Sequence, residues 1–305
     1  MAVVSVKAAT SPIRPFGVAA YRKPAARGLV PPFLAIVVMT VLYVLEITTP
    51  TFVAALTVLM FLAGIPHGAA EHDAATGHAR IPSLPYISLY MVVGTGLFLL
   101  FLVAPLPGAV GFIALSALHF SRAEYRRHRA LGVFATVAAF LFSPERTADI
   151  IAGIAGDAVA PAVFMAAGAI AAAAALCVIV IELSRRPDPV GIARLAATIL
   201  AFAILPPLTA MAVYFLILHS AKAYTDPVRA GQTPRDAVIA FSTIGGPAVL
   251  IGLLTMWVWT TGALSTAIVA AAALAFAMPH MMFDLTGHWA GGWRAAISRR
   301  RRRDI

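Results

Sequence analysis

Charged residues and cysteine are both scarce in this 305-residue sequence. Asp, Glu, Lys and Arg together make up 12% of the chain and apolar residues 61%, whereas soluble domains carry about 25% charged residues. This balance excludes an ordinary soluble domain and predicts an integral membrane protein. The single cysteine, Cys177, lies in an apolar run, which excludes both a disulfide framework and a thiolate metal site. Any bound metal must therefore be held by histidine and carboxylate side chains.

The sequence also has few lysines and no N-terminal segment of the signal-peptide type. Lysine occurs only at positions 7, 23 and 222. A retinal-binding opsin needs a lysine inside a helix for its Schiff base, so an opsin-type pump is disfavoured. Residues 1–30 hold basic residues and prolines but no apolar segment of the signal-peptide kind. We interpret this segment as a basic cytoplasmic arm.

Apolar windows bounded by proline, glycine or charge predict an all-α fold. The windows are residues 31–48, 51–66, 84–104, 107–121, 130–144, 159–183, 190–206, 207–221, 237–261 and 263–283. Some are shorter than the roughly 17 to 25 residues of a membrane helix. We therefore expect a polytopic integral membrane bundle of about eight to ten transmembrane helices. It covers residues 31–285, and a basic cytoplasmic tail follows at 286–305.

The distribution of positive charge predicts the orientation of this bundle. Arginine-rich connections alternate along the chain with connections that are nearly free of arginine. By the positive-inside rule, the arginine-rich connections and both termini are cytoplasmic. The formal net charge of +10 then reflects anchoring to anionic membrane lipid. A nucleic-acid partner is not expected.

Four histidines end apolar runs at the same predicted, cytoplasmic face of the bundle. They are His67, His119, His219 and His280. A lone histidine at a helix end is by default an interfacial polar residue. Four at matched depth predict a shared metal site, since the carbonyl ends of helices also favour a cation. Imidazole suits iron, zinc and copper alike, so the ligand type alone does not choose the metal.

Two of these histidines are followed by a carboxylate at the same spacing. Glu71 lies four residues after His67, and Asp284 lies four residues after His280. In a continuous helix this spacing places both groups on one face. Each carboxylate is therefore a candidate to orient the neighbouring imidazole through its second nitrogen, or to bind the metal directly.

The motifs that contain these histidines resemble a known family. They are GIPHGAAEHD at 64–73, LHF at 118–120 with an acidic residue five positions after its histidine, YFLILHS at 214–220 and MPHMMFD at 278–284. In this order they resemble the Brp/Blh family of bacterial and archaeal membrane β-carotene 15,15'-dioxygenases, over roughly residues 60–285. The resemblance implies a non-haem Fe(II) enzyme of the bacterial inner membrane that cleaves the central double bond of β-carotene with O₂ to give retinal. The implied partners are β-carotene or a related carotenoid, O₂ and membrane lipid.

The resemblance also implies metal ligands at His67, His119 and His219. The third family motif has the form WHxxxH, and this chain departs from it with Leu218 before His219 and Ala223 in place of the second histidine. The alternatives for a further ligand are His280, His72, Glu71 and Asp284. The alternative function is a carotenoid- or metal-binding membrane protein of the same family that does not cleave its ligand.

Two other classes of membrane protein fit the histidines less well. Transporters usually place their ionisable residues near the middle of the membrane, at broken helices. The histidines here lie at one predicted face instead. Membrane desaturases and hydroxylases use HxxxH and HxxHH boxes, and the sequence contains neither pattern.

Overall fold

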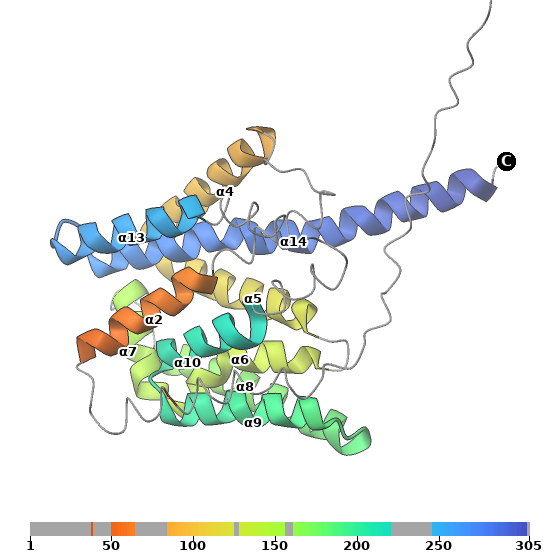
Figure 1. The fold of residues 1–305 in the computed structure, drawn as a ribbon, viewed down its shortest axis with the longest axis horizontal. Helices are drawn as coiled ribbons and strands as arrows, with labels where there is room; N and C mark the ends of the chain where they lie inside the picture. The colour runs from red at the N-terminus through yellow and green to blue at the C-terminus, as the bar shows by residue number, and fades with distance from the viewer. Residues whose placement is uncertain are drawn as a thin grey trace, which may run out of the picture.

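The fold is known from a computed structural model that describes residues 50–64, 84–124, 128–155, 161–220 and 246–303, together with Val38. Within these ranges the regular elements are ten α-helices and one π-helical turn, and no strand is present. Figure 1 shows the helices arranged as a bundle. The predicted all-helical architecture is confirmed for the part of the chain that the structure describes.

The helices follow the predicted apolar windows from residue 51 onward. They are α2 (Pro50–Gly64), α4 (Leu84–Val103), α5 (Pro105–Ala123), α6 (Arg129–Phe142), α7 (Pro144–Ala155), α8 (Pro161–Arg185), α9 (Pro189–Ile204), α10 (Pro207–Val213), the π-helix η2 (Tyr214–Ser220), α13 (Gly246–Thr260) and α14 (Thr266–Arg303). Six of them begin at a proline. Proline suits the first helical position because its ring fixes φ and the missing N–H would have no partner there. Apart from Val38, the predicted window 31–48 lies outside the described residues.

Within the described residues, two helices differ from the predicted boundaries by more than three residues; the start of the predicted window 237–261, before residue 246, lies outside these residues. Residues 144–155, predicted to be part of a connection, form α7, because Ile151 is buried against apolar side chains of α6 and α8. Helix α14 continues past the predicted end at residue 283 to Arg303. Pro279 lies inside this helix and does not end it. His280 therefore lies within a continuous helix rather than at its terminus.

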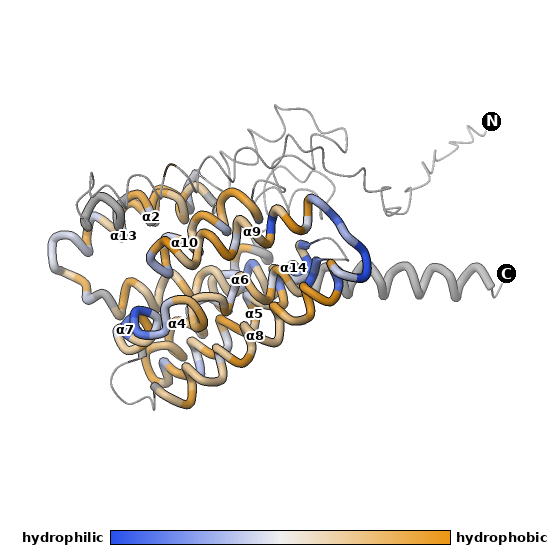
Figure 2. The backbone as a smooth tube through the Cα atoms, turned by 90° about the horizontal axis from the view of Figure 1, so that it is seen from below, coloured by the Kyte–Doolittle hydropathy of each residue, from blue (hydrophilic) through white to orange (hydrophobic). Residues whose placement is uncertain are grey.

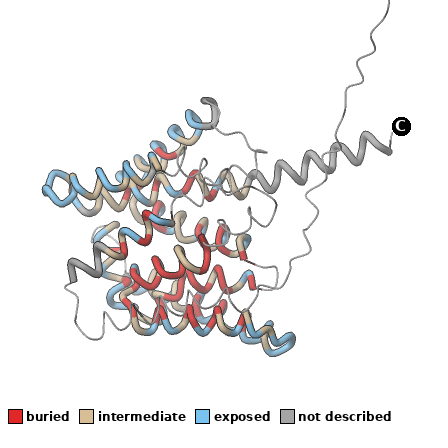
Figure 3. The backbone as a smooth tube through the Cα atoms, in the orientation of Figure 1, coloured by how far each residue is buried: buried red, intermediate tan, exposed pale blue. Residues whose placement is uncertain are grey.

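Helix α5 lies between two packed groups of helices (Figure 1). On one side α6 packs against α5, α8 and α9, and on the other α14 packs against α4 and α5. The largest buried cluster combines side chains from α2, α6, α8, α9 and α10, and Figure 3 shows many of the buried positions in this part of the bundle. The ends of α5, η2 and the middle of α14 consequently meet next to this core.

Many large apolar side chains are exposed on the outside of the bundle, and Figure 2 shows that hydrophobic residues predominate along its helices. On α8, Val163 is 73% exposed and Ile170 69% exposed. Two described helical segments, Ala162–Arg185 and Ala267–Leu285, are long and apolar enough to cross a membrane. Exposed apolar surface of this extent marks contact with lipid or with another protein.

Candidate functional site

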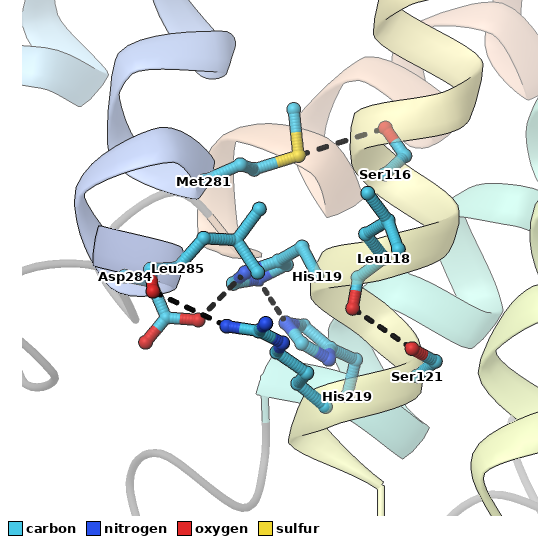
Figure 4. Close-up of polar contacts among 9 residues, drawn as sticks. Ser116, Leu118, His119, Ser121, His219, Met281, Asp284 and Leu285 are labelled. Atoms are coloured by element: carbon cyan, nitrogen blue, oxygen red, sulfur yellow. Dashed lines mark hydrogen bonds and ion pairs between the residues drawn. The ribbon is translucent and has the colours of Figure 1, made fainter. Parts of the chain in front are cut away.

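The structure brings three of the predicted histidines together. His119 comes from α5, His219 from η2 and His280 from α14. The Nε2 atoms of His119 and His219 face each other at 3.3 Å, as Figure 4 shows. The ring of His280 meets the ring of His119 edge-on, with 5.3 Å between the ring centroids. His119 is 2% exposed and His219 3% exposed, so both rings are withdrawn from solvent.

Asp284 holds the other nitrogen of His119. The carboxylate Oδ2 lies 3.1 Å from His119 Nδ1. An acceptor at Nδ1 favours the tautomer with its proton on that atom, which leaves the Nε2 lone pair directed at His219. The sequence predicted that Asp284 orients His280. Its observed partner is His119, from a different helix, and a role toward His280 stays a prediction.

His219 lies in an irregular part of the chain. Residues Tyr214–Ser220 form a π-helical turn that continues α10. Such turns occur mostly as single insertions in α-helices and are frequent at functional sites. The His219 ring contacts two aromatic rings, with centroids 4.5 Å away for Phe120 and 5.9 Å away for Phe215. These contacts fix the plane of the imidazole.

The helix around His280 is irregular for another reason. Pro279 lacks an N–H, so the carbonyl of Ala275, four residues earlier, loses its normal helical partner, and the proline ring crowds the preceding turn of α14. The Tyr90 hydroxyl of α4 donates a hydrogen bond to the Phe276 carbonyl at 2.5 Å. Gly94 allows this approach, since a Cβ there would lie 2.7 Å from the Phe276 ring. Helix α4 thus supports the turn that precedes His280.

A glycine fixes the position of the helix that carries His119. A Cβ on Gly132 of α6 would lie 2.4 Å from the Phe120 carbonyl carbon. Helix α6 therefore crosses the backbone of α5 in direct contact, one residue beyond His119. No other residue type fits this crossing without moving one of the two helices.

Sequence analysis missed a buried ionic group beside the histidines. Arg194 of α9 forms an ion pair with Glu124, at 2.6 Å between Nη2 and Oε1. The Tyr214 hydroxyl donates to the same carboxylate oxygen at 3.2 Å. One signal was present, because Arg194 interrupts an apolar window. An ionisable residue in a predicted membrane segment usually has a partner and a function.

Four residues named in the sequence analysis lie outside the described residues: His67, His72, Glu71 and Ala223. Among the residues that are described, no three or more His, Cys, Asp or Glu side chains are grouped as a metal site by themselves. In the described part of the chain, two imidazole nitrogens converge, those of His119 and His219.

Comparison with known proteins decides the family. A family model described as Beta-carotene 15,15'-dioxygenase matches residues 58–285. This range covers most of the chain and includes all four predicted histidines. The chain belongs to the beta-carotene 15,15'-dioxygenase family. No curated protein and no solved structure matches it. Family membership confirms the resemblance inferred from the motifs. The histidine cluster, which consists of His119, His219 and His280, lies inside the family region.

Proposed function

We propose that this protein is a membrane-embedded, iron-dependent oxygenase that cleaves the central double bond of β-carotene, or of a related carotenoid, to give retinal. The family supports a dioxygenase that acts on a carotenoid. The observation that carries the proposal is the pair of buried imidazoles, His119 and His219, whose Nε2 atoms face each other at 3.3 Å.

The donor atoms of this pair fit a shared metal ion. Two nitrogens bound to one ion at about 2.1 Å, with an angle between about 90° and 109°, lie roughly 3.0 to 3.4 Å apart. The observed separation of 3.3 Å falls in this range. Asp284 at the Nδ1 of His119 supplies the carboxylate that commonly accompanies a histidine ligand. His67, from the PHG motif, is the proposed third ligand.

Several residues around the two facing histidines have a role in the proposed reaction. Bound Fe(II) would supply the activation of O₂, which neutral histidine ligands permit because they leave coordination positions open. Asp284 holds the proton at His119 Nδ1, and Phe120 and Phe215 hold the plane of the His219 ring. The apolar helices exclude water and solvate the polyene.

The proposed reaction balances without another reductant. One carbon–carbon double bond of the substrate breaks, and each of its two carbons becomes an aldehyde carbon. The two oxygen atoms come from one molecule of O₂. No proton has to be supplied or removed overall, so the site needs no strong acid or base in contact with the substrate.

The apolar exterior and the charge pattern support a location in the membrane. Exposed side chains such as Val163 and Ile170 on α8 are proposed to contact the acyl chains of lipid. The positive-inside rule then places the histidine cluster toward the cytoplasmic face of the bacterial inner membrane. A carotenoid dissolved in the bilayer would reach the site without passing through water.

Expression in a carotenoid-producing bacterial host tests the proposal. Loss of yellow colour, with retinal in the pigment extract and about one iron per chain after anaerobic purification, is the expected result. His119→Ala should abolish retinal formation and iron retention. His128→Asn is the matched control, because His128 is also buried and also pairs with an aspartate, Asp188, but lies outside the cluster. It should retain both properties.

Two outcomes would contradict the proposal in different ways. Iron retention without retinal would favour the carotenoid- or metal-binding alternative, which Ala223 motivates. Equal iron content and equal retinal in His119→Ala and wild type would show that the histidine cluster is not the site.

A further inference from the structure

We propose that Arg194, with Glu124 and Tyr214, positions His219 against His119. The inference deepens the proposed function, because it assigns a role to a buried polar group that contains neither a predicted ligand nor a predicted substrate contact. It is carried by the contacts of one guanidinium nitrogen with two different helices.

Arg194 Nη2 connects the two segments that carry the facing histidines. It donates to Glu124 Oε1 at 2.6 Å and to the Leu218 carbonyl at 3.1 Å. Glu124 is the C-cap residue that follows α5, five positions after His119. Leu218 directly precedes His219 in η2. A single donor group thus fixes the distance between the end of one histidine-bearing helix and the backbone of the other.

The Leu218 carbonyl accepts a hydrogen bond from the side chain of another helix, 3.1 Å from Arg194 Nη2. Arg194 comes from α9, which packs beside η2, and reaches this carbonyl from there.

Tyr214 completes the group from the start of the same turn. Its hydroxyl donates to Glu124 Oε1 at 3.2 Å, and its side chain is buried. Tyr214 and Leu218 are therefore both attached to the carboxylate of Glu124, Tyr214 directly and Leu218 through Arg194. These two attachments flank the part of the turn that leads to His219.

Removing the charges of Glu124 and Arg194 from water costs free energy. The side chain of Glu124 is 0% exposed and that of Arg194 6% exposed. Two charges withdrawn from water are often no more stabilising than apolar side chains of similar size. An ion pair kept in an apolar bundle therefore points to a demand for a specific geometry, and here the geometry concerns the turn that carries His219.

The test compares Arg194→Met, Arg194→Lys and wild type in detergent solution. Hydrogen–deuterium exchange of peptides that cover 214–220 measures how stably the turn is folded, and it needs no metal. Titration with Co(II) under anaerobic conditions measures metal affinity, which depends on the position of His219. Arg194→Met should accelerate exchange in this segment and weaken Co(II) binding about tenfold or more. Arg194→Lys should recover part of both, since one ammonium group can reach the same two oxygens.

Thr147→Val is the matched control. Thr147 is also buried, and its hydroxyl donates to the Ala139 and Ser143 carbonyls between α6 and α7. Removing it deletes buried hydrogen bonds without touching η2. Exchange at 214–220 and Co(II) affinity should both stay at the wild-type level, so a merely structural loss is distinguished from a loss of positioning.

Several outcomes would overturn the inference. Unchanged exchange in Arg194→Met would show that the turn does not depend on Arg194. Faster exchange with unchanged Co(II) affinity would show that the turn does not position His219. If wild type binds no Co(II), the proposed function fails instead, and the exchange data still decide whether Arg194 holds the turn. If Arg194→Met does not fold, Tyr214→Phe, which keeps the ion pair, takes its place with the same readouts.

Discussion

Replacing Asp284 with asparagine tests whether the carboxylate tunes His119 as a metal ligand. Asparagine has nearly the same shape, and its carbonyl oxygen can still accept the proton of His119 Nδ1. The substitution therefore removes the negative charge and leaves the packing of α14 against α5 in place. The contact to be altered is the 3.1 Å approach of Oδ2 to Nδ1.

The expected effect follows from the burial of the pair. His119 is almost fully buried and the Asp284 side chain is 18% exposed, so solvent screens the interaction only in part. Loss of a carboxylate behind a histidine ligand weakens metal binding by about 10-fold to 100-fold. Because the hydrogen bond itself survives, we expect the lower end, about tenfold or roughly 1.4 kcal/mol. Asp284→Leu, which removes the acceptor as well, should approach a hundredfold.

The assay is an anaerobic Co(II) titration followed by visible absorption, on protein whose folding is checked by circular dichroism. Asp188→Asn is the control, because the Asp188 carboxylate also lies 3.1 Å from a histidine nitrogen, that of His128, outside the cluster. Asparagine can also keep the N-cap hydrogen bond that Asp188 accepts from Val190. Equal Co(II) affinity in the two asparagine variants would refute the role assigned to Asp284.

Three further predictions concern the ligands and the helix crossing. His219→Ala should lose stoichiometric iron, measured by metal analysis after anaerobic purification, because one of the two facing nitrogens is removed. Ala223→His should raise iron affinity or retinal yield, because it restores the family's second histidine one turn after His219; no change in either would place the further ligand elsewhere. Gly132→Ala should lower the thermal midpoint, since its Cβ would contact the Phe120 backbone, and overpacking of this kind costs about 1–3 kcal/mol. An unchanged midpoint would mean that α6 can shift freely.

The two irregular helical segments in the site share a design. Each places a histidine beside a stretch where the normal helical hydrogen bonds are interrupted, at η2 for His219 and at Pro279 for His280. In each, a side chain from a neighbouring helix donates to a backbone carbonyl, Arg194 to Leu218 and Tyr90 to Phe276. Side chains from neighbouring helices thus supply hydrogen bonds to the backbone in both irregular segments.

The sequence by itself determined the helical class, most helix boundaries and the histidines of the candidate site. These are local properties. A long run of apolar residues with a proline at its start indicates a helix from the local sequence alone. Motifs such as LHF and MPHMMFD identify the family without any knowledge of which helices touch. The extra helix α7 and the extension of α14 were missed because tertiary contacts and a tolerated Pro279 decided them.

Only the tertiary structure decided which groups meet. Asp284 is four residues from His280 in the chain, yet its observed contact is with His119, 165 positions away. Glu124 and Arg194 are 70 positions apart, and no local spacing connects them. Their pairing depends on the register between helices, which is set by packing over entire interfaces, as at Gly132 against Phe120. The spacing of residues along one helix determines which of them lie on the same face. Only the packing of the helices against one another determines which residues of other helices that face contacts.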